Sequence, residues 1–274
     1  MKLLLLFLFL LLGLSIQAQD IRFAYYYTFI PDSTNRAEVK SELMNLDVSK
    51  SGSRFYSYTK YRSDSVTRVN LEKQLMNTGN IMVKSTQERG AVKYSVTKKY
   101  PEYTTCLHSA ILGDKYKIPE ERTMVWKITS EKKKIGDWTT QRAETYFAGR
   151  LWFAWFTTDI PVQDGPYKFR GLPGLIVRLE DSTQSHVFTL QSVKNISSIE
   201  SAFFEANELI VSAKRYSQLL KDYENDPAGG IKKLMAGGMT MIRKDGPNSS
   251  VKDQEKRMKE RFRKDNNRIE LNAF

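Results

Sequence analysis

The first part of the chain alternates apolar and polar positions. Across residues 21–30 every second side chain is aromatic or β-branched. A period of two is typical of a strand that buries one face of a sheet. Residues 44–48 repeat the pattern, and residues 55–58 continue it beyond the turn-forming segment 51–53. This region therefore predicts a meander of antiparallel strands.

The middle of the chain mixes strands with one helix. Residues 64–76 space their apolar side chains at helical intervals and predict a short helix. Residues 151–156 contain no polar side chain, which is typical of a strand buried on both faces or at the centre of a sheet. Residues 175–193 alternate around the turn 181–185 and predict a β-hairpin. Further strands are predicted at residues 91–96, 104–109, 124–128 and 139–147.

Helical signals gather after residue 199. Residues 212–223 predict a helix, and Ser250 opens a last helix that runs to about Asp265, with a thin apolar stripe among basic residues. The pattern as a whole predicts an α+β, β-rich fold. Its curved, mostly antiparallel sheet is open or forms a partial barrel, and helices follow at the C-terminal end. Residues 19–274 are predicted to form a single domain whose helical part begins near residue 199.

The first 18 residues have the layout of a secretory signal peptide. Lys2 precedes the apolar run 3–12, and Ala18 supplies a small residue at a cleavage point. No cysteine lies near that junction, so we expect no lipid anchor on an acylated cysteine. We expect an exported protein, periplasmic or surface-associated, that is soluble after signal-peptide cleavage.

The amino-acid composition limits which binding and metal sites the chain can form. Cys106 is the only cysteine, and His108 and His186 are the only histidines, so we expect no disulfide, no Cys/His metal site and no cofactor. The formal charge of +12 at pH 7 is enough to attract anions, although we favour the interpretation that it is solvated surface charge. Three kinds of partner stay open: an anionic envelope component, an outer-membrane protein or a periplasmic protein. Nucleic acid is not expected, because the chain carries an export signal and no recognised reader motif.

Residues 159–176 form a block rich in glycine and proline. Gly171 and Gly174 flank Pro173, which indicates a backbone that needs positive φ or a close approach at a rigid corner. Lys168 and Arg170 precede this corner, and two interpretations stay open: structural turn chemistry, which we favour, or the binding of an anionic group against backbone N–H groups.

Aromatic residues gather beside this block. Alternation along residues 151–156 puts Trp152 and Trp155 on opposite faces of the strand, and Tyr167 lies within the block. Two interpretations stay open: both aromatic faces form core, or one of them lines a groove. For a groove we expect a peptide-like or lipid-like ligand. The expected contact residues are Trp152, Trp155, Tyr167, Lys168, Arg170, Gly171 and Gly174.

The hexapeptide at residues 171–176, with Gly149-Arg150 and Gly165-Pro166 before it, resembles the central block of the GLPGLI family of exported envelope proteins. The ends of the chain resemble that family too, so the likeness extends over nearly all of residues 19–274. It implies a shared fold and an exported compartment but no activity, because the family is largely uncharacterised. Many members have a cysteine shortly before the Gly-Arg pair, whereas residues 138–141 contain none. Any role of that cysteine does not transfer to this chain.

Three function classes stay open. The leading hypothesis is a non-catalytic binding or accessory module whose sheet groove holds the ligand, with no catalytic residue assigned. The second is an envelope hydrolase that uses Cys106 or a serine with His108, since Cys106 and His108 share one face of a predicted strand. The third is a structural partner of an outer-membrane complex, held through the basic last helix.

Overall fold

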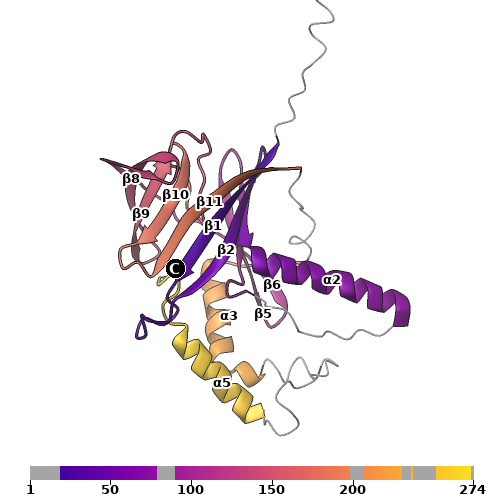
Figure 1. The fold of residues 1–274 in the computed structure, drawn as a ribbon. Coiled ribbons are helices and arrows are strands. Elements are labelled where there is room, and N and C mark those ends of the chain that lie inside the picture. Colours follow the sequence, from indigo (N-terminus) through magenta and orange to yellow (C-terminus); the bar gives the residue numbers. More distant parts are fainter. Residues whose placement is uncertain (1–18, 79–89, 198–206, 230–235, 237–250, 273–274) are drawn as a thin grey trace, which may run out of the picture.

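The computed structural model of the protein describes residues 19–78, 90–197, 207–229, 236 and 251–272. One large β-sheet with attached helices makes up the described chain (Figure 1). The strands are β1 (Asp20–Phe29), β2 (Lys40–Ser49), β3 (Gly52–Ser57), β4 (Ser95–Lys99), β5 (Thr104–Ile111), β6 (Asp114–Pro119), β7 (Lys127–Ile135), β8 (Trp138–Phe147), β9 (Arg150–Thr157), β10 (Leu175–Asp181), β11 (His186–Ile196) and β12 (Leu209–Ile210). The helices are α2 (Tyr58–Thr78), α3 (Ala213–Asn225) and α5 (Val251–Lys264).

The twelve strands follow the order β12-β6-β5-β4-β3-β2-β1-β11-β10-β9-β8-β7. Neighbouring strands are antiparallel except for β12, which pairs with β6 in parallel. Strands β1 and β11 lie side by side at the centre although they are far apart in the chain. Figure 1 shows the sheet bent around this pair, with β8–β10 on one side and β5–β6 on the other. The predicted open, mostly antiparallel sheet with C-terminal helices is confirmed.

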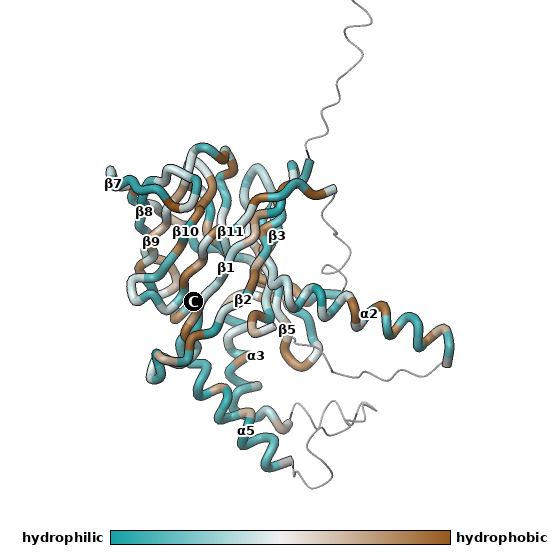
Figure 2. The backbone as a smooth tube through the Cα atoms, in the orientation of Figure 1, coloured by the Kyte–Doolittle hydropathy of each residue, from teal (hydrophilic) through white to brown (hydrophobic). Residues whose placement is uncertain are grey.

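The hydrophobic core lies against one face of the sheet, called the inner face below. Alternate residues of β1, β2, β9 and β10 contribute to it, as their period of two predicts. The Gly/Pro block crosses this face, and the ring centroid of Phe169 lies 4.7 Å from that of Trp152. Leu172 from the same block is 1% exposed. Figure 2 shows the apolar positions concentrated in the sheet, whereas α5 is hydrophilic along most of its length.

The helices attach at the margins of the sheet. Helix α2 is longer than the predicted 64–76, and its Tyr61 packs on Tyr56 of β3 with ring centroids 5.3 Å apart. Helix α3 begins after Ser212, whose hydroxyl accepts a hydrogen bond from Arg215 N, as an N-cap does. Helix α5 lies against α3 in Figure 1. The C-terminal helices therefore form a unit beside the strands.

For two strands, the first residue predicted from the sequence is wrong. The strand predicted at 91–96 starts only at Ser95, because the backbone N–H of Val92 donates to the carboxylate of Glu42 at 2.9 Å instead of to a neighbouring strand. The strand predicted at 124–128 starts at Lys127. Before it, side chains hold the backbone: the Thr145 hydroxyl donates to the carbonyl of Val125 at 2.7 Å.

Within the described residues, no helix combines the length and the apolar content that a bilayer crossing needs. The signal peptide predicted at residues 1–18 and the start of the last helix at Ser250 lie outside the described residues. All described strands, β12 included, join one sheet, and the single domain over 19–274 stays a prediction.

Candidate functional site

The Gly/Pro block fills the inner side of the bent sheet. Gly174 has φ +149°, and a Cβ there would lie 2.0 Å from the carbonyl oxygen of Thr157. Glycine is therefore required where the block turns into β10. Gly171 has φ +88° and is exposed, with no atom near the position of a Cβ. The sequence correctly indicated a positive φ at one glycine and a close approach at the other.

A buried ion pair anchors the block to β4. Lys98 and Asp164 are fully buried and their side chains form an ion pair. Lys98 Nζ also donates to the carbonyl oxygens of Gly165 at 2.8 Å and Phe169 at 3.2 Å. Burial lowers the pKa of Lys98, and the charge of Asp164 opposes that shift. A buried charge with this many partners holds the loop in one position.

A second buried network joins the block to the C-terminal segment. Lys168 Nζ lies 2.7 Å from the carboxylate of Glu120 and 2.6 Å from that of Glu270. The Tyr167 hydroxyl donates to Glu270 at 2.7 Å. Burial would raise the pKa of Glu120, but hydrogen bonds from Arg122 and the charge of Lys168 lower it to about 2. The polar atoms of Tyr167 and Lys168 are thus occupied by the chain itself.

A third network surrounds His186. Its Nε2 lies 2.9 Å from the carbonyl oxygen of Asn267, so Nε2 carries the hydrogen. The Tyr27 hydroxyl then donates to Nδ1 at 2.7 Å. Arg150 bridges Asp181, at 3.0 Å, and the side-chain oxygen of Asn267, at 2.6 Å. Burial, reinforced by the charge of Arg150, lowers the pKa of His186 to about 4.

The residues expected at a ligand groove do not share one surface. Trp152 is 0% and Trp155 3% exposed, and they lie on opposite faces of β9. Arg170 is half-buried and donates to the Thr105 hydroxyl at 3.1 Å. Trp152 packs against the Gly/Pro block, Tyr167, Lys168 and Gly174 are buried within the block, and Gly171 is exposed at its corner. Ligand binding by this set stays a prediction.

The opposite face of β8, β9 and β10 carries a different arrangement, which we call the outer aromatic face. On β9 it presents Leu151, Phe153 and Trp155, while Trp152 points to the core. Register places Phe153 between two glutamates and Trp155 between two arginines of the neighbouring strands. The outer aromatic face comprises Arg142, Glu144, Tyr146, Leu151, Phe153, Trp155, Arg178 and Glu180.

Charges on this face are paired and lie close to the rings. Arg142 forms an ion pair with Glu144 at 3.0 Å, and its guanidinium lies 4.3 Å from the ring centroid of Phe153. Arg178 pairs with Glu180 at 2.6 Å. All four charged side chains keep part of their surface exposed, between 14% and 31%. The face therefore offers donors, acceptors and aromatic surface within three strands.

Trp155 is capped by Lys133. The Lys133 ammonium lies 3.6 Å from the ring centroid of Trp155. The indole Nε1 is buried, and no hydrogen-bond partner for it exists among the described residues. An unpaired buried donor of this kind calls for a physical explanation. The flexible Lys133 side chain lies over this ring, so its displacement would increase the exposure of the indole.

The sequence reasoning did not identify Arg142, Glu144, Arg178 and Glu180 as charged members of one face. A signal existed: Arg142-x-Glu144 and Arg178-x-Glu180 repeat the same spacing on two strands. A spacing of two puts both charges on one face of each strand. Which strands flank residues 151–156 could not be read from that pattern, because it depends on long-range pairing.

The residues of the hydrolase alternative form a separate cluster. His108 Nδ1 lies 2.8 Å from the Glu208 carboxylate, and Nε2 lies 2.8 Å from the Thr97 hydroxyl. A carboxylate only accepts, so Nδ1 carries the proton and Thr97 donates to Nε2. Burial lowers the pKa of His108, and burial raises the pKa of the Cys106 thiol. A protonated thiol is a poor nucleophile. The cluster borders a pocket of about 120 Å³.

Comparison with known proteins covers part of the chain. Residues 149–178 match the model of a family described as a protein of unknown function (Porph_ging). This stretch holds the centre of the GLPGLI resemblance, which itself stays a prediction. No curated protein matches the chain.

Two solved structures are similar to the chain. A structure of PNGF-II in space group P21 matches with a TM-score of 0.50, and one in space group C2 with 0.49, both at 16% identity over 73% of this chain. The matches cover 33% and 32% of the PNGF-II chains, so this chain spans about a third of their length. At such low identity, the first match shows a shared fold and carries nothing about activity.

Proposed function

We propose that the protein is an exported, non-catalytic binding module that takes a peptide-like ligand on its outer aromatic face. The supporting observation is the contrast across β9. The inner aromatic side chain Trp152 packs on the chain's own Phe169, whereas Phe153 and the exposed Tyr146 face away from the core. A partner therefore has aromatic surface to contact only on the outer side of this strand among the described residues.

The chemistry of the outer aromatic face favours a peptide over a lipid. An acyl chain laid across Phe153 would desolvate the ion pairs Arg142–Glu144 and Arg178–Glu180 without replacing their contacts with water. A peptide brings apolar side chains for the rings together with its own charges and backbone polar groups. The inner side of the sheet, where a lipid would be expected, is occupied by Phe169 and Leu172.

The experiment is selection of peptides from a random displayed library on the full-length mature protein. Affinities of the selected peptides are then measured by fluorescence anisotropy. We expect Tyr146→Ala and Phe153→Ala to weaken binding about tenfold, since aromatic contacts commonly carry 1 kcal/mol or more of interface energy. Tyr58→Ala serves as the matched control, because Tyr58 is also an exposed tyrosine but lies at the start of α2.

Three outcomes would contradict the proposal. Equal losses from Tyr146→Ala and Tyr58→Ala would show that the selected peptides do not use the outer aromatic face. A lipid retained by the protein from its native compartment, seen by native mass spectrometry and lost in Phe153→Ala, would replace the peptide-like ligand with a lipid-like one. Peptide binding that survives both outer-face substitutions would also reject it.

A hydrolase alternative is kept, with Thr97 in place of the Cys106 or serine nucleophile that the sequence suggested. Thr97, His108 and Glu208 are hydrogen-bonded in the order hydroxyl, imidazole, carboxylate. That order is the one that activates a hydroxyl nucleophile. A panel of chromogenic esters and amides tests it directly. Turnover by the wild-type protein that disappears in both Thr97→Val and His108→Ala would establish hydrolysis and reject the non-catalytic proposal. We expect no turnover above buffer from any of the three proteins.

A further inference from the structure

Helix α5 is anchored by one side and leaves another side free. Phe262 packs edge-on against Tyr223 of α3, with ring centroids 5.3 Å apart. Beyond the end of α5, Arg268 forms an ion pair with Glu224 of α3. These contacts set which side of the helix faces α3. A second flank of α5, about 60–120° around the helix from Phe262, is exposed and mostly charged.

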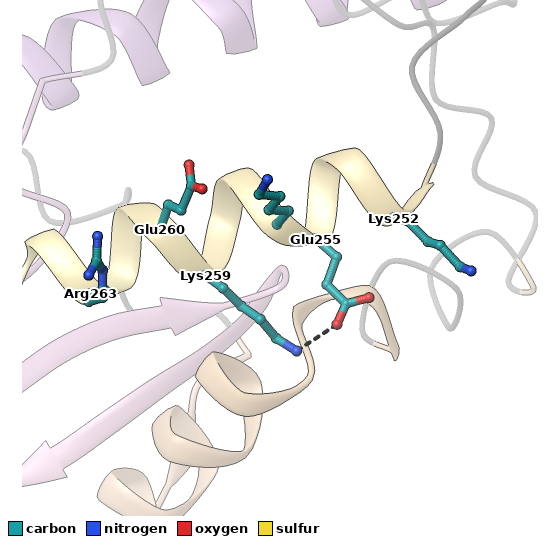
Figure 3. Close-up of a pocket in the computed structure, with 6 residues that line it drawn as sticks. Lys252, Glu255, Lys259, Glu260 and Arg263 are labelled. Atoms are coloured by element: carbon teal, nitrogen blue, oxygen red, sulfur yellow. Dashed lines mark hydrogen bonds and ion pairs between the residues drawn. The ribbon is translucent and has the colours of Figure 1, made fainter.

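The cations of that flank form a row. Along the described helix, seven lysines and arginines stand against three acidic residues. At 3.6 residues per turn, Lys252, Lys256, Lys259 and Arg263 fall within an arc of about 60°. All four are exposed, and together they line a shallow depression of about 370 Å³ (Figure 3). The row extends over about 16 Å of the helix axis.

Acidic residues border the row on both sides. Glu255 lies on one side and pairs with Lys259 at 2.6 Å, as the dashed line in Figure 3 shows. Glu260 lies on the other side and is exposed. Within the described chain, Lys252, Lys256 and Arg263 have no ion pair. The positive surface is therefore long and narrow, with negative margins.

We infer that this row, Lys252, Lys256, Lys259 and Arg263, docks an acidic helical segment of a partner protein. Glutamates spaced at i, i+4, i+7 and i+11 on a helix repeat the same spacing and fall on one stripe. Such a helix aligned with α5 places its acidic stripe on the cations, and basic residues at its flanks meet Glu255 and Glu260.

A flat anionic membrane fits this surface less well. A bilayer approaching the row also meets Glu255 and Glu260, whose carboxylates it repels. The apolar stripe of α5 cannot insert as an alternative, because Phe262 is turned towards Tyr223. A narrow partner with charges of both signs avoids both difficulties.

The test uses a fluorescein-labelled, alanine-rich helical peptide with glutamates at i, i+4, i+7 and i+11 and lysines on either side. A second peptide has the same composition with the glutamates distributed around the helix. Binding to the full-length protein is followed by fluorescence anisotropy at low and at physiological salt. Vesicles containing phosphatidylserine are assayed by co-sedimentation.

The variant Lys252→Glu/Lys256→Glu/Arg263→Glu reverses three cations of the row. Its matched control, Lys127→Glu/Lys132→Glu/Lys134→Glu, makes the same charge change on the exposed strand β7. We expect the first variant to bind the striped peptide about tenfold more weakly and the control to change affinity less than about twofold. We also expect the redistributed peptide and the vesicles to bind more weakly than the striped peptide.

Three results would overturn the inference. Equal losses in the two triple variants would show attraction by net charge alone. Equal binding of the two peptides would show that affinity does not depend on the glutamates lying along one side of the peptide helix. Vesicle binding that exceeds peptide binding and is lost in the α5 variant would assign the surface to a membrane. None of these readouts depends on Tyr146 or Phe153, so the outer-face proposal stands or falls separately.

Discussion

The two faces of strand β9 bury their aromatic residues in different ways. On the inner face Trp152 is covered by a loop of the same chain, which Lys98 and Asp164 anchor through a buried ion pair. On the outer face the flexible side chain of Lys133 lies over the ring of Trp155. The inner arrangement is part of the folded core, whereas the outer one can change without unfolding the sheet. Exposure values alone, 0% and 3%, would not separate these two tryptophans.

This contrast predicts that substitutions on the inner face of the sheet lower the free energy of unfolding most. Asp164→Ala leaves the Lys98 ammonium buried without its counter-charge and removes the acceptor for Ser53 and Tyr100. We expect a loss of about 3–5 kcal/mol in the free energy of unfolding, measured by urea denaturation. The outer counterpart, Glu180→Ala, breaks a partly exposed pair with Arg178 and is expected to cost at most about 1 kcal/mol. Equal losses would contradict the distinction between the faces.

The hydrogen-bond network around His186 also predicts that the stability of the fold depends on pH. The pKa of His186 is about 4 in the folded protein, below the ordinary histidine value of 6.5, so the unfolded chain binds more protons between these values. Stability is therefore fully present above pH 6.5 and is lost as the pH falls towards 4, by roughly 3 kcal/mol. Urea denaturation across this range measures the slope. His186→Gln should flatten it, and His108→Gln, which removes the other histidine whose pKa is lowered by burial, separates the contributions of the two histidines. An unchanged slope in His186→Gln would reject the assignment.

Glycines of the block allow a finer test. Gly174→Ala places a Cβ against the Thr157 backbone, so we expect a loss of about 2 kcal/mol or more in unfolding free energy. Gly171→Ala meets no atom and suffers only from its positive φ, at about 1 kcal/mol. Thermal and urea unfolding of the two variants make the comparison. A larger loss at Gly171 would show that the block is held differently.

Local patterns in the sequence predicted much of the fold. Alternation correctly placed the hairpin of β10 and β11, and the strand β9 lay at residues 150–157 where an apolar run predicted it. The neighbours of each strand could not be predicted. Pairing of β1 with β11 joins distant parts of the chain, and no local period encodes it. The strand order therefore came only with the structure.

The candidate site was less predictable for the same reason. Lys98 is fully buried although the next residue, Lys99, is exposed, and its partner Asp164 lies far along the chain. Composition favours lysine at the surface, so nothing in the local sequence marks this one as buried. Alternation showed that Trp152 and Trp155 face opposite ways, but the loop that covers Trp152 decides which face is core. That loop contact is a tertiary effect.

The smallest expected effect concerns the cap on the outer face. Lys133→Ala removes the ammonium over the Trp155 ring and is expected to cost at most about 1 kcal/mol in unfolding free energy, as exposed cation–π contacts do. It should nevertheless uncover the indole, so acrylamide quenches the tryptophan fluorescence more strongly than in the wild type. Trp152 is fully buried and does not contribute to this gain. Lys134→Ala, at the next position of β7, is the control and should leave quenching unchanged. If quenching in Lys133→Ala equals that in Lys134→Ala, Trp155 is enclosed by rigid packing as Trp152 is, and the two faces of β9 do not differ in the way described.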